Sequence, residues 1–257
     1  MSLFIGMGKG ACFAVLIFLF AVFIPGSLHA ADFDINPVRV FFDPGQKASV
    51  IKIKNNGEEK FSLQLTVFEW SQDAEGKDVY VPTKELIAFP KILSVGKDEE
   101  RLIRVGMKTA ARNEEKTFRI YLDEIPVQET PGESSAKIRT LMRVGLPVFL
   151  APLKPSAKAE ILEPALSKGT LSFVLRNSGN VHFMIRKGKA QGVDAAGITV
   201  FETEIVGRYI LQGNSRRLST PLAQEDCKKA SALNIEITTD RATVSERMDV
   251  LPEMCSP

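Results

Sequence analysis

Short runs of alternating apolar and polar residues, separated by turn residues, recur along most of the chain. Between residues 31 and 152 the runs are VRVFF, ASVIKIKN, FSLQLTVFEW, LIRVGM, TFRIYLDEIP and LMRVGLPVFLAP, and the turn segments include DPGQK, NNGEE, DAEGKD and TPGESS. A period of two is typical of β-strands that bury one face, and many short strands at regular spacing favour an antiparallel sandwich. No helix is predicted after the first thirty residues.

A stretch with three prolines and two lysines, APLKPSAKAEILEP at residues 151–164, interrupts this pattern. Such a composition is typical of a domain boundary, which we place near Pro152 to Pro155. After it the strand pattern resumes as TLSFVLRN, VHFMIRKGKA, GITVFETEIV, RYILQG, RRLSTPL, ALNIEITTD and ERMDVL. The sequence therefore predicts an all-β protein with two sandwich domains, residues 31–152 and 153–257.

The first thirty residues predict a signal for export. Lys9 is their one charged side chain, and it precedes the apolar run ACFAVLIFLFAVFIPG and a cleavage pattern that ends in Ala30. Pro25 and Gly26 leave this run short for a membrane span, which needs about 20 apolar residues, so an uncleaved anchor is the lesser alternative. We predict a signal peptide over residues 1–30 and an exported mature chain.

Charge and cysteine content narrow the class of partner and the compartment. The formal net charge of +2 falls to +1 without Lys9, and the positive charges are scattered among acids, so nucleic acid is not an expected partner. In an exported protein, Cys227 and Cys255 predict a disulfide worth roughly 3 to 4 kcal/mol, with two free thiols as the alternative. This bond would tie the open end of a hairpin formed by ALNIEITTD and ERMDVL.

Residues that could support catalysis are scarce. Once the signal is removed, His182 is the only histidine, and NSGNVHF contains no nucleophile elbow, so a packed or turn-bonding histidine is expected. Asp123 and Glu124 are adjacent and point to opposite faces of a strand, which makes them a poor acid and base couple. There is no Gly-rich phosphate loop and no set of zinc ligands. We expect no enzyme activity, no nucleotide, no metal and no other cofactor.

Arg39 is the unusual residue of the first strand run, INPVRVFFDPG. If this run is a strand, Arg39 shares a face with Pro37 and Phe41 and does not lie on a purely polar side. A cation at such a position either extends its head into water from an edge strand or meets an anionic partner.

Several of these stretches together resemble the PapD-like family, the periplasmic pilus chaperones of the chaperone-usher pathway. They are VRVFFD, RLIRVGM, TFRIYLDEIP and VGLPVFLAP in the first domain and RNSGNVHFMI in the second. The stretch FEWSQDAEGKDVYVPTKELIAFPKI is similar to the branch that assembles archaic pili. The residues that carry this similarity are Trp70, Gln72, Gly76, Asp78, Pro82 and Thr83.

The resemblance implies two immunoglobulin-like sandwiches set in an L, with a cleft between them, in the periplasm. It also implies donor-strand complementation. In this activity the chaperone lends an edge strand, here KIRTLMRVGLPVF, to the open groove of a pilin subunit and then passes the subunit to an outer-membrane usher. Ile138, Thr140, Met142 and Val144 would supply the inserting side chains. Alternatively, this series faces the protein's own core. The preceding VQETPGESSAK is poor in apolar residues, so we expect it to be disordered without a subunit.

The resemblance matches Arg39 to the family's cleft arginine, which binds the C-terminal carboxylate of the subunit. The family's second anchor is a lysine, and the same match puts Pro147 at its position, where there is no charge. The carboxylate would then be held by Arg39 alone, by Arg143 or Arg101, or in a different geometry. We take Arg143 as the candidate substitute, and a solvated edge arginine is the alternative.

Two other functions compete with this interpretation. A pilus or surface structural subunit would carry an N-terminal extension, for which ADFDINPVRV is too short. A secreted carbohydrate-binding β-sandwich would have only Trp70, Tyr80 and Tyr121 as platforms for sugars. An exposed apolar edge strand also favours a self-capping dimer or oligomer of the free protein.

Overall fold

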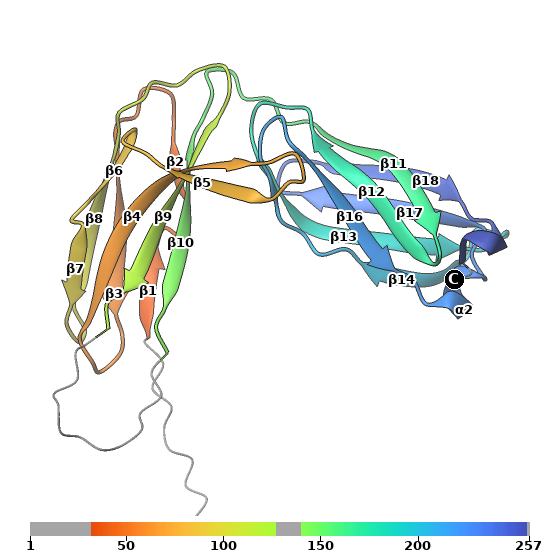
Figure 1. Ribbon diagram of the computed structural model, residues 1–257, viewed down its shortest axis with the longest axis horizontal. Helices are drawn as coiled ribbons and strands as arrows, with labels where there is room; N and C mark the ends of the chain where they lie inside the picture. The colour runs from red at the N-terminus through yellow and green to blue at the C-terminus, as the bar shows by residue number, and fades with distance from the viewer. Residues whose placement is uncertain (1–31, 127–139, 256–257) are drawn as a thin grey trace, which may run out of the picture. The chain divides into compact units, whose positions relative to one another are not determined.

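The computed structural model describes residues 32–126 and 140–255, and nearly all of their regular structure is β-strand (Figure 1). The alternation of apolar and polar residues explains why these segments form strands. In β3 (Ala48–Asn55), for example, Ile51 and Ile53 are buried whereas Lys52 and Lys54 are exposed. One face of each such strand is therefore available for a core.

The first sandwich consists of two sheets. A four-stranded sheet has the order β1-β3-β8-β6 and contains, besides β3, the strands β1 (Phe33–Asn36), β8 (Glu100–Met107) and β6 (Leu86–Phe89). The other sheet has the order β2-β10-β9-β4-β5, and β7 also pairs with β4. Its strands are β2 (Val40–Phe42), β10 (Arg143–Leu150), β9 (Lys116–Glu124), β4 (Phe61–Gln72), β5 (Asp78–Pro82) and β7 (Ile92–Val95). Their inward side chains form one continuous core.

The chain changes sheets between β1 and β2, and Arg39 lies at this change. β1 pairs with β3, and β2 pairs with β10 in the other sheet. Pro37 has no backbone N–H to continue a ladder, and Val38 and Arg39 form a bend. The prediction that Arg39 lies in the middle of a strand was therefore wrong, because the strand run from Val38 to Phe42 begins only at Val40.

β10 is paired unevenly along its length, and this feature positions the candidate site. All eight of its residues pair antiparallel with β9, from Arg143 opposite Asp123 to Leu150 opposite Lys116. On its other side, β2 pairs in parallel with Val148, Phe149 and Leu150 only. Among the described residues, no strand pairs with the outer edge of β10 from residue 143 to 147.

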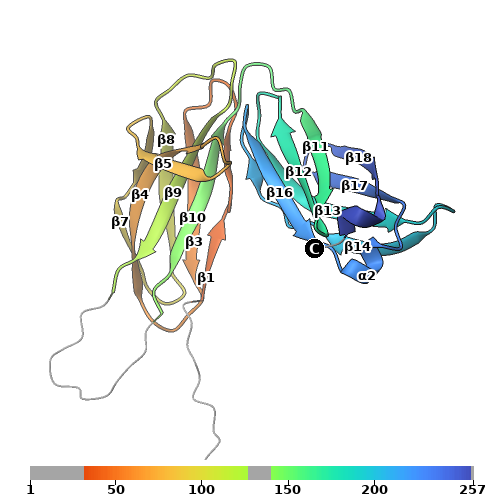
Figure 2. The same ribbon diagram turned by 45° about the vertical axis from the view of Figure 1, so that its right-hand side comes forward.

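The second sandwich also has two sheets (Figure 2). The three-stranded sheet has the order β11-β12-β16, with β11 (Ala159–Ser167), β12 (Thr170–Asn177) and β16 (Ser215–Pro221). The five-stranded sheet has the order β14-β13-β17-β18, with β15 paired to β13. Its strands are β14 (Thr199–Glu204), β13 (Phe183–Val193), β17 (Ala232–Thr239), β18 (Thr243–Asp249) and β15 (Tyr209–Ile210). A second hydrophobic core fills this sandwich.

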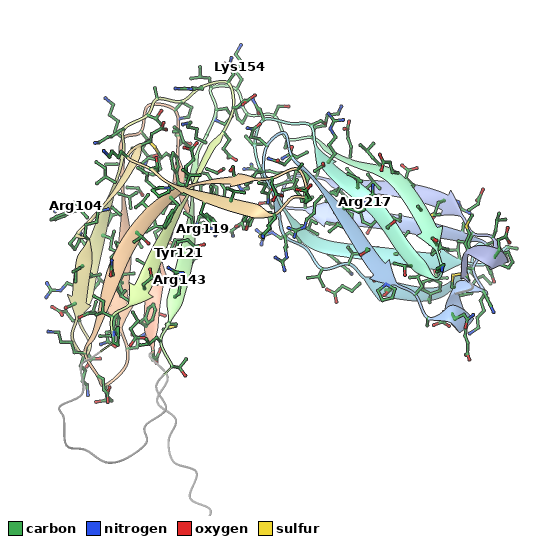
Figure 3. The ribbon with its side chains drawn as sticks, viewed as in Figure 1. Arg104, Arg119, Tyr121, Arg143, Lys154 and Arg217 are labelled. Carbon is green, nitrogen blue, oxygen red and sulfur yellow. A yellow bond between two sulfur atoms is a disulfide. The ribbon has the colours of Figure 1, made fainter. Side chains whose placement is uncertain are left out.

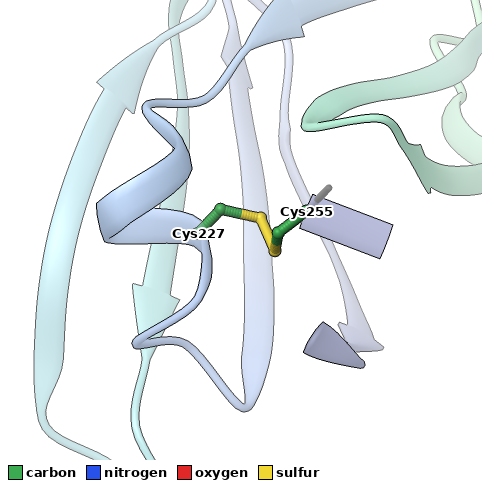
Figure 4. Close-up of a disulfide and its surroundings, with 2 residues drawn as sticks. All are labelled: Cys227 and Cys255. Carbon is green, nitrogen blue, oxygen red and sulfur yellow. A yellow bond between two sulfur atoms is a disulfide. The ribbon is translucent and has the colours of Figure 1, made fainter. Parts of the chain in front are cut away.

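A disulfide joins Cys227 to Cys255, the pairing that the sequence predicts (Figure 4). The two cysteines flank the hairpin of β17 and β18 in the sequence, and that hairpin is also present. They lie in two short helices, α2 (Gln224–Cys227) and the 3-10 helix η1 (Pro252–Cys255). The prediction of no helix was thus wrong for these two, because four residues are too few to show a helical period.

β11 is a strand that the sequence pattern concealed. It begins at Ala159, inside the stretch that was interpreted as a boundary, which leaves residues 151–158 as the connection between the sandwiches. Glu163 has a positive φ of 51°, Pro164 has no N–H, and the pairing with β12 shifts register between Leu162 and Ala165. Such a bulge breaks the alternation from which strands are recognised.

Candidate functional site

The six-stranded sheet has an outer face that turns away from its own core. Leu146, Val148 and Leu150 belong to the core. Because successive side chains on a strand point to opposite faces, Pro147 and Phe149 lie on the outer face. Val144 shares the inward face and packs against the core, so the core-facing alternative describes this residue of the expected donor series.

Three residues come together near one end of this outer face. Pro147 lies opposite Arg119 of β9. On the other side of β10, Val148 pairs in parallel with Val40, and Arg39 comes one residue before Val40, in the bend where this pairing begins. Arg119, Pro147 and Arg39 thus form a short row across β9, β10 and the bend before β2. Arg39 is half-buried and makes no hydrogen bond or ion pair within residues 32–126 and 140–255.

Aromatic side chains surround this row. Trp70 is only 2% exposed, and its ring centre lies 6.1 Å from that of Phe149 and 5.5 Å from that of Tyr209. Tyr121 lies edge-on to Tyr80 at 5.6 Å and to Phe68 at 5.8 Å. Edge-to-face packing of this kind fixes ring positions. Since Trp70 is buried, it cannot serve as the open sugar platform that the carbohydrate-binding alternative required.

Two arginines, Arg119 and Arg143, stack on these rings, and they differ in their partners. Figure 3 labels both arginines and Tyr121. The guanidinium carbon of Arg119 lies 4.0 Å from the Trp70 ring centre, and that of Arg143 lies 4.9 Å from the Tyr121 ring centre. Arg143 also binds Asp123 through Nε and through Nη2, which lies 3.3 Å from Oδ2. The hydrogen bond to Asp123, together with its charge, raises the pKa of Arg143.

Arg143 and Arg101 are therefore both engaged with carboxylates of the chain itself. The Arg143 side chain is 65% exposed, so its pair with Asp123 is a surface ion pair of the weak kind. Arg101 lies in β8 of the four-stranded sheet and binds Glu99 at 2.5 Å between Nη2 and Oε1. In the strand pairing, Arg143 lies opposite Asp123 and Arg101 lies opposite Ile53, so neither arginine is paired with Pro147.

Gln72 and Gly76, two of the residues that suggested the archaic branch, lie against the second sandwich. The side-chain amide of Gln72 donates to the Tyr209 carbonyl at 3.0 Å and to Asp78 at 3.1 Å, and its oxygen accepts the Leu211 N–H at 2.9 Å. Gly76 has a positive φ of 74°, and a Cβ there would lie 2.9 Å from the Ser215 carbonyl oxygen. Gln72 and Gly76 thus hold the β4–β5 hairpin close to residues 209–216 of the second sandwich.

Tyr80 stays a neutral phenol at this junction. Its hydroxyl donates to Asp78 at 3.2 Å. Burial, followed by a hydrogen bond with Tyr121, raises its pKa, and the nearby charge of Arg119 partly opposes this shift. A tyrosine held in this way can donate or accept a hydrogen bond but does not supply a negative charge.

His182 is packed, as its sequence context predicts, and its partner is a residue that sequence reasoning did not find. The side chain is 1% exposed and lies 3.6 Å from Phe149 between ring centres. Glu115 accepts the backbone N–H of His182 at 2.8 Å and contacts its Nδ1 at 2.7 Å. Within residues 32–126 and 140–255 there is no group of three or more His, Cys, Asp or Glu side chains that could hold a metal.

Of the remaining donor residues, Thr140 and Met142 come shortly before β10 in the chain. Thr140 is exposed, and Met142 is partly buried and extends the ladder with β9 through its carbonyl, which accepts the Glu124 N–H at 2.9 Å. Ile138 and the segment VQETPGESSAK fall outside the described residues. Within the described ranges, no helix is long and apolar enough to cross a membrane.

The first sandwich matches a known protein family. Residues 32–155 match the family model described as pili and flagellar-assembly chaperone, PapD N-terminal domain. No curated protein matches the chain.

Solved structures share the fold of both sandwiches. A chain of the CsuC-CsuE chaperone-tip adhesion subunit pre-assembly complex, from archaic chaperone-usher Csu pili of Acinetobacter baumannii, is 18% identical, with 84% of this chain and 98% of that chain covered and a TM-score of 0.56. A chain of the Salmonella enterica SafA pilin complex with the SafB chaperone is 11% identical, with 87% of this chain and 99% of that chain covered and a TM-score of 0.58. The E. coli chaperone DraB is 14% identical, with 86% of this chain and 100% of that chain covered and a TM-score of 0.54.

These similarities define the class: an all-β protein of two immunoglobulin-like sandwich domains, as the sequence predicts. The family match places the first sandwich, residues 32–155, in the PapD-like family of pilus assembly chaperones, and both sandwiches have the fold of solved chaperones of the chaperone-usher pathway. This is a family of chaperones and not of enzymes.

Proposed function

We propose that this protein is a periplasmic chaperone that binds, folds and caps pilin subunits by donor-strand complementation and delivers them to an outer-membrane usher. The signal over residues 1–30 exports it. The domain boundaries are those expected from the sequence, 31–152 and 153–257. Energy comes from strand exchange, so neither a nucleotide nor another cofactor takes part.

The open outer edge of β10 is the observation that carries this proposal. Residues 143–147 pair with β9 on one side and with no described strand on the other. Unpaired N–H and C=O groups along an edge form a template for a further strand. Val144 and Leu146 pack towards the protein's own core, so over these residues a partner strand would be held chiefly by hydrogen bonds to the backbone of β10.

The donor side chains and the anchor extend this proposal to particular residues. Ile138, Thr140 and Met142 precede the part of β10 that belongs to the protein's own core, and Val144 stands at the junction. Side chains in this series can fill the groove of a subunit, and methionine adapts its shape to an imperfect groove. Arg39, half-buried and without an internal carboxylate among the described residues, binds the C-terminal carboxylate of the subunit.

The structural similarities support a pilin as the partner class. The structures titled as complexes pair a chaperone with a tip adhesion subunit or with a pilin. The same open edge would let two copies of the free protein pair with each other, so a self-capping dimer is part of the proposal.

Co-purification from the periplasm tests the proposal. A candidate pilin from the same genome is expressed with the wild-type protein, with Arg39→Glu or with Met142→Glu, and the soluble pilin bound to each is quantified. We expect the wild type to hold soluble pilin and both variants to lose at least about tenfold, because each places an unpaired carboxylate where the subunit must pack. Leu141→Glu is the matched control, since its side chain is exposed and alternates to the other face.

The possible results separate the proposal from its alternatives. Equal amounts of bound pilin in all four samples would leave Arg39 as an ordinary surface arginine and would refute donor-strand binding at β10. Circular dichroism of each variant must show the wild-type β signal, so that a loss of binding is not a loss of folding.

A further inference from the structure

The backbone of β10 turns alternate residues towards β9 and towards the open outer edge. The Glu124 N–H donates to the Met142 carbonyl at 2.9 Å, so the backbone groups of Met142 face β9. On the other side of β10, the Ala151 N–H donates to the Phe42 carbonyl of β2, also at 2.9 Å. Since the N–H and C=O groups of successive residues in a strand point to opposite sides, even-numbered residues of β10 face β9 and odd-numbered residues face the outer edge.

The open part of this edge therefore has few hydrogen-bonding groups. Its odd-numbered residues are Arg143, Gly145 and Pro147. Arg143 and Gly145 each direct an N–H outward, and no strand within residues 32–126 and 140–255 pairs with them on that side. Pro147 has no N–H. The Gly145 carbonyl already accepts a long hydrogen bond of 3.4 Å from Nη1 of Arg119. An added strand thus finds two backbone N–H donors on β10.

Pro147 stands at the last position before β2 closes the edge. β2 pairs with β10 from Val148 onward. Pro147 is buried and lies opposite Arg119 of β9, and by the alternation above this pair exchanges no backbone hydrogen bonds. The proline therefore leaves the ladder between β9 and β10 intact, because the N–H that it lacks would face the outer edge. Its effect falls on a strand that is added from outside.

The missing N–H shortens the ladder that such a strand can form. A backbone carbonyl that enters a sheet edge needs a donor. The carbonyl of the added strand that meets Pro147 finds none on β10, so the last donor of the ladder is the Gly145 N–H. One net hydrogen bond changes an equilibrium constant roughly two- to tenfold. The edge therefore holds its partner less tightly than it would with a third donor, and a protein that must hand its partner on benefits from this.

We propose that Pro147 is a stop for strand addition. It ends the backbone ladder between β10 and a bound pilin strand after the N–H groups of Arg143 and Gly145, and it thereby speeds the release of the subunit. The role belongs to the backbone and requires no charged side chain. This inference rests on the proposed function, since it requires a pilin strand to be paired with the outer edge of β10.

Two measurements on the complex with a pilin test the stop. Amide exchange is followed by NMR in the free protein and in the complex. In the second measurement, protein with a fluorophore at its N-terminus is held in the complex, unlabelled wild-type protein is added in excess, and the rate at which label leaves the complex is recorded.

Four variants are compared with the wild type. Pro147→Ala restores an outward N–H, and Arg143→Pro removes one. Arg143→Gln is the matched control for Arg143→Pro, because it removes the same guanidinium and keeps the N–H. Pro155→Ala is the control for Pro147→Ala, because it removes an exposed proline from the connection between the sandwiches.

We expect the amides of Arg143 and Gly145 to exchange at least about tenfold more slowly in the complex than in the free protein, and the amide that Pro147→Ala introduces should gain similar protection. Pro147→Ala should slow the release of label roughly fivefold, because the ladder gains a hydrogen bond. Arg143→Pro should release label roughly fivefold faster than Arg143→Gln, because the ladder loses one. Pro155→Ala should release it at the wild-type rate.

Other results have distinct meanings. If the wild type forms no complex, or if Arg143 and Gly145 gain no protection in it, the proposed function fails at β10 and the inference fails with it. If both amides are protected but Pro147→Ala releases label at the wild-type rate with its new amide unprotected, the stop is refuted while the proposed function stands. Circular dichroism compares the folding of the free variants. If Pro147→Ala does not fold, equal release rates for Arg143→Pro and Arg143→Gln refute the proposal.

Discussion

The last strand of each sandwich has an outer edge that is unpaired among the described residues, over part of β10 and along β18, and the two edges differ in chemistry. β18 ends the five-stranded sheet, and its exposed positions are polar or charged: Thr243, Ser245, Glu246, Arg247 and Asp249. β10 has its outer edge open over residues 143–147, where only Arg143 is charged and Val144, Gly145, Leu146 and Pro147 follow. Charged edges resist pairing with another chain, and apolar edges invite it.

The two sandwiches also differ in what holds the end of the hydrophobic core together. In the second sandwich, Cys227 and Cys255 are part of the core, and their disulfide fastens the segments on both sides of the last hairpin. In the first sandwich, the core ends at Leu146, with Val144 packed at its margin, while β10 continues towards Thr140. One molecule thus contains a closed sandwich and a sandwich whose edge is available to a partner.

Loss of the disulfide should have the largest effect of the three changes, and it should affect the closed second sandwich and not the open edge of the first. In Cys227→Ser/Cys255→Ser, the free energy of unfolding of the second sandwich is expected to fall by roughly 3 to 4 kcal/mol, because the unfolded chain regains the freedom of a long loop. Urea denaturation followed by circular dichroism measures the change, and reduced wild-type protein serves as the control. The amount of pilin that co-purifies at low temperature should stay as in the wild type. A large loss of bound pilin in a still-folded double mutant would show that the closed sandwich also binds the subunit.

Removal of the Glu115 carboxylate should have the next largest effect. Glu115→Ala leaves the buried backbone N–H of His182 without its acceptor, which costs about 1 to 3 kcal/mol. Glu115→Gln keeps an oxygen at that place and should cost less. Chemical denaturation of the two variants provides the comparison, and equal losses would mean that the packing of the side chain matters more than the hydrogen bond.

Substitution of Arg143 should have the smallest effect. Because its pair with Asp123 is exposed to water, Arg143→Gln is expected to shift the melting temperature by less than about 2 °C and to leave the amount of co-purified pilin within about twofold of the wild type. Arg39→Glu provides the contrast in the same assay. A loss of bound pilin in Arg143→Gln as large as in Arg39→Glu would show that Arg143 also anchors the subunit.

Much of the fold can be predicted from the sequence, because alternation identifies strands that bury one face. The runs that became β3, β4, β9, β12 and β17 show it plainly. The short strands β5, β6 and β7 escape this kind of recognition, since four or five residues give little periodicity. β11 was missed because a bulge at Glu163 and Pro164 breaks its alternation.

The candidate site was less accessible to sequence reasoning than the fold. Arg39 attracts attention because it stands in an apolar run, but Arg119 in TFRIYLDEIP looks like an ordinary outward-facing residue of a strand. Its interest comes from the register that sets it opposite Pro147 and from Trp70 beneath it. Glu115 is likewise distant from His182 in sequence. Pairings between remote strands are set by tertiary packing, which local pattern does not contain.

Amide hydrogen exchange along β10 and β18, in the free protein and in its complex with a pilin, tests the central claim most directly. Amides of residues 143–146 that do not face β9 should exchange rapidly in the free protein and at least about tenfold more slowly in the complex, because a new strand hydrogen-bonds to them. Amides on the outer edge of β18 should exchange equally in both states. Protection of β18 on binding, with no change along β10, would contradict the claim that the first sandwich lends its edge to the subunit.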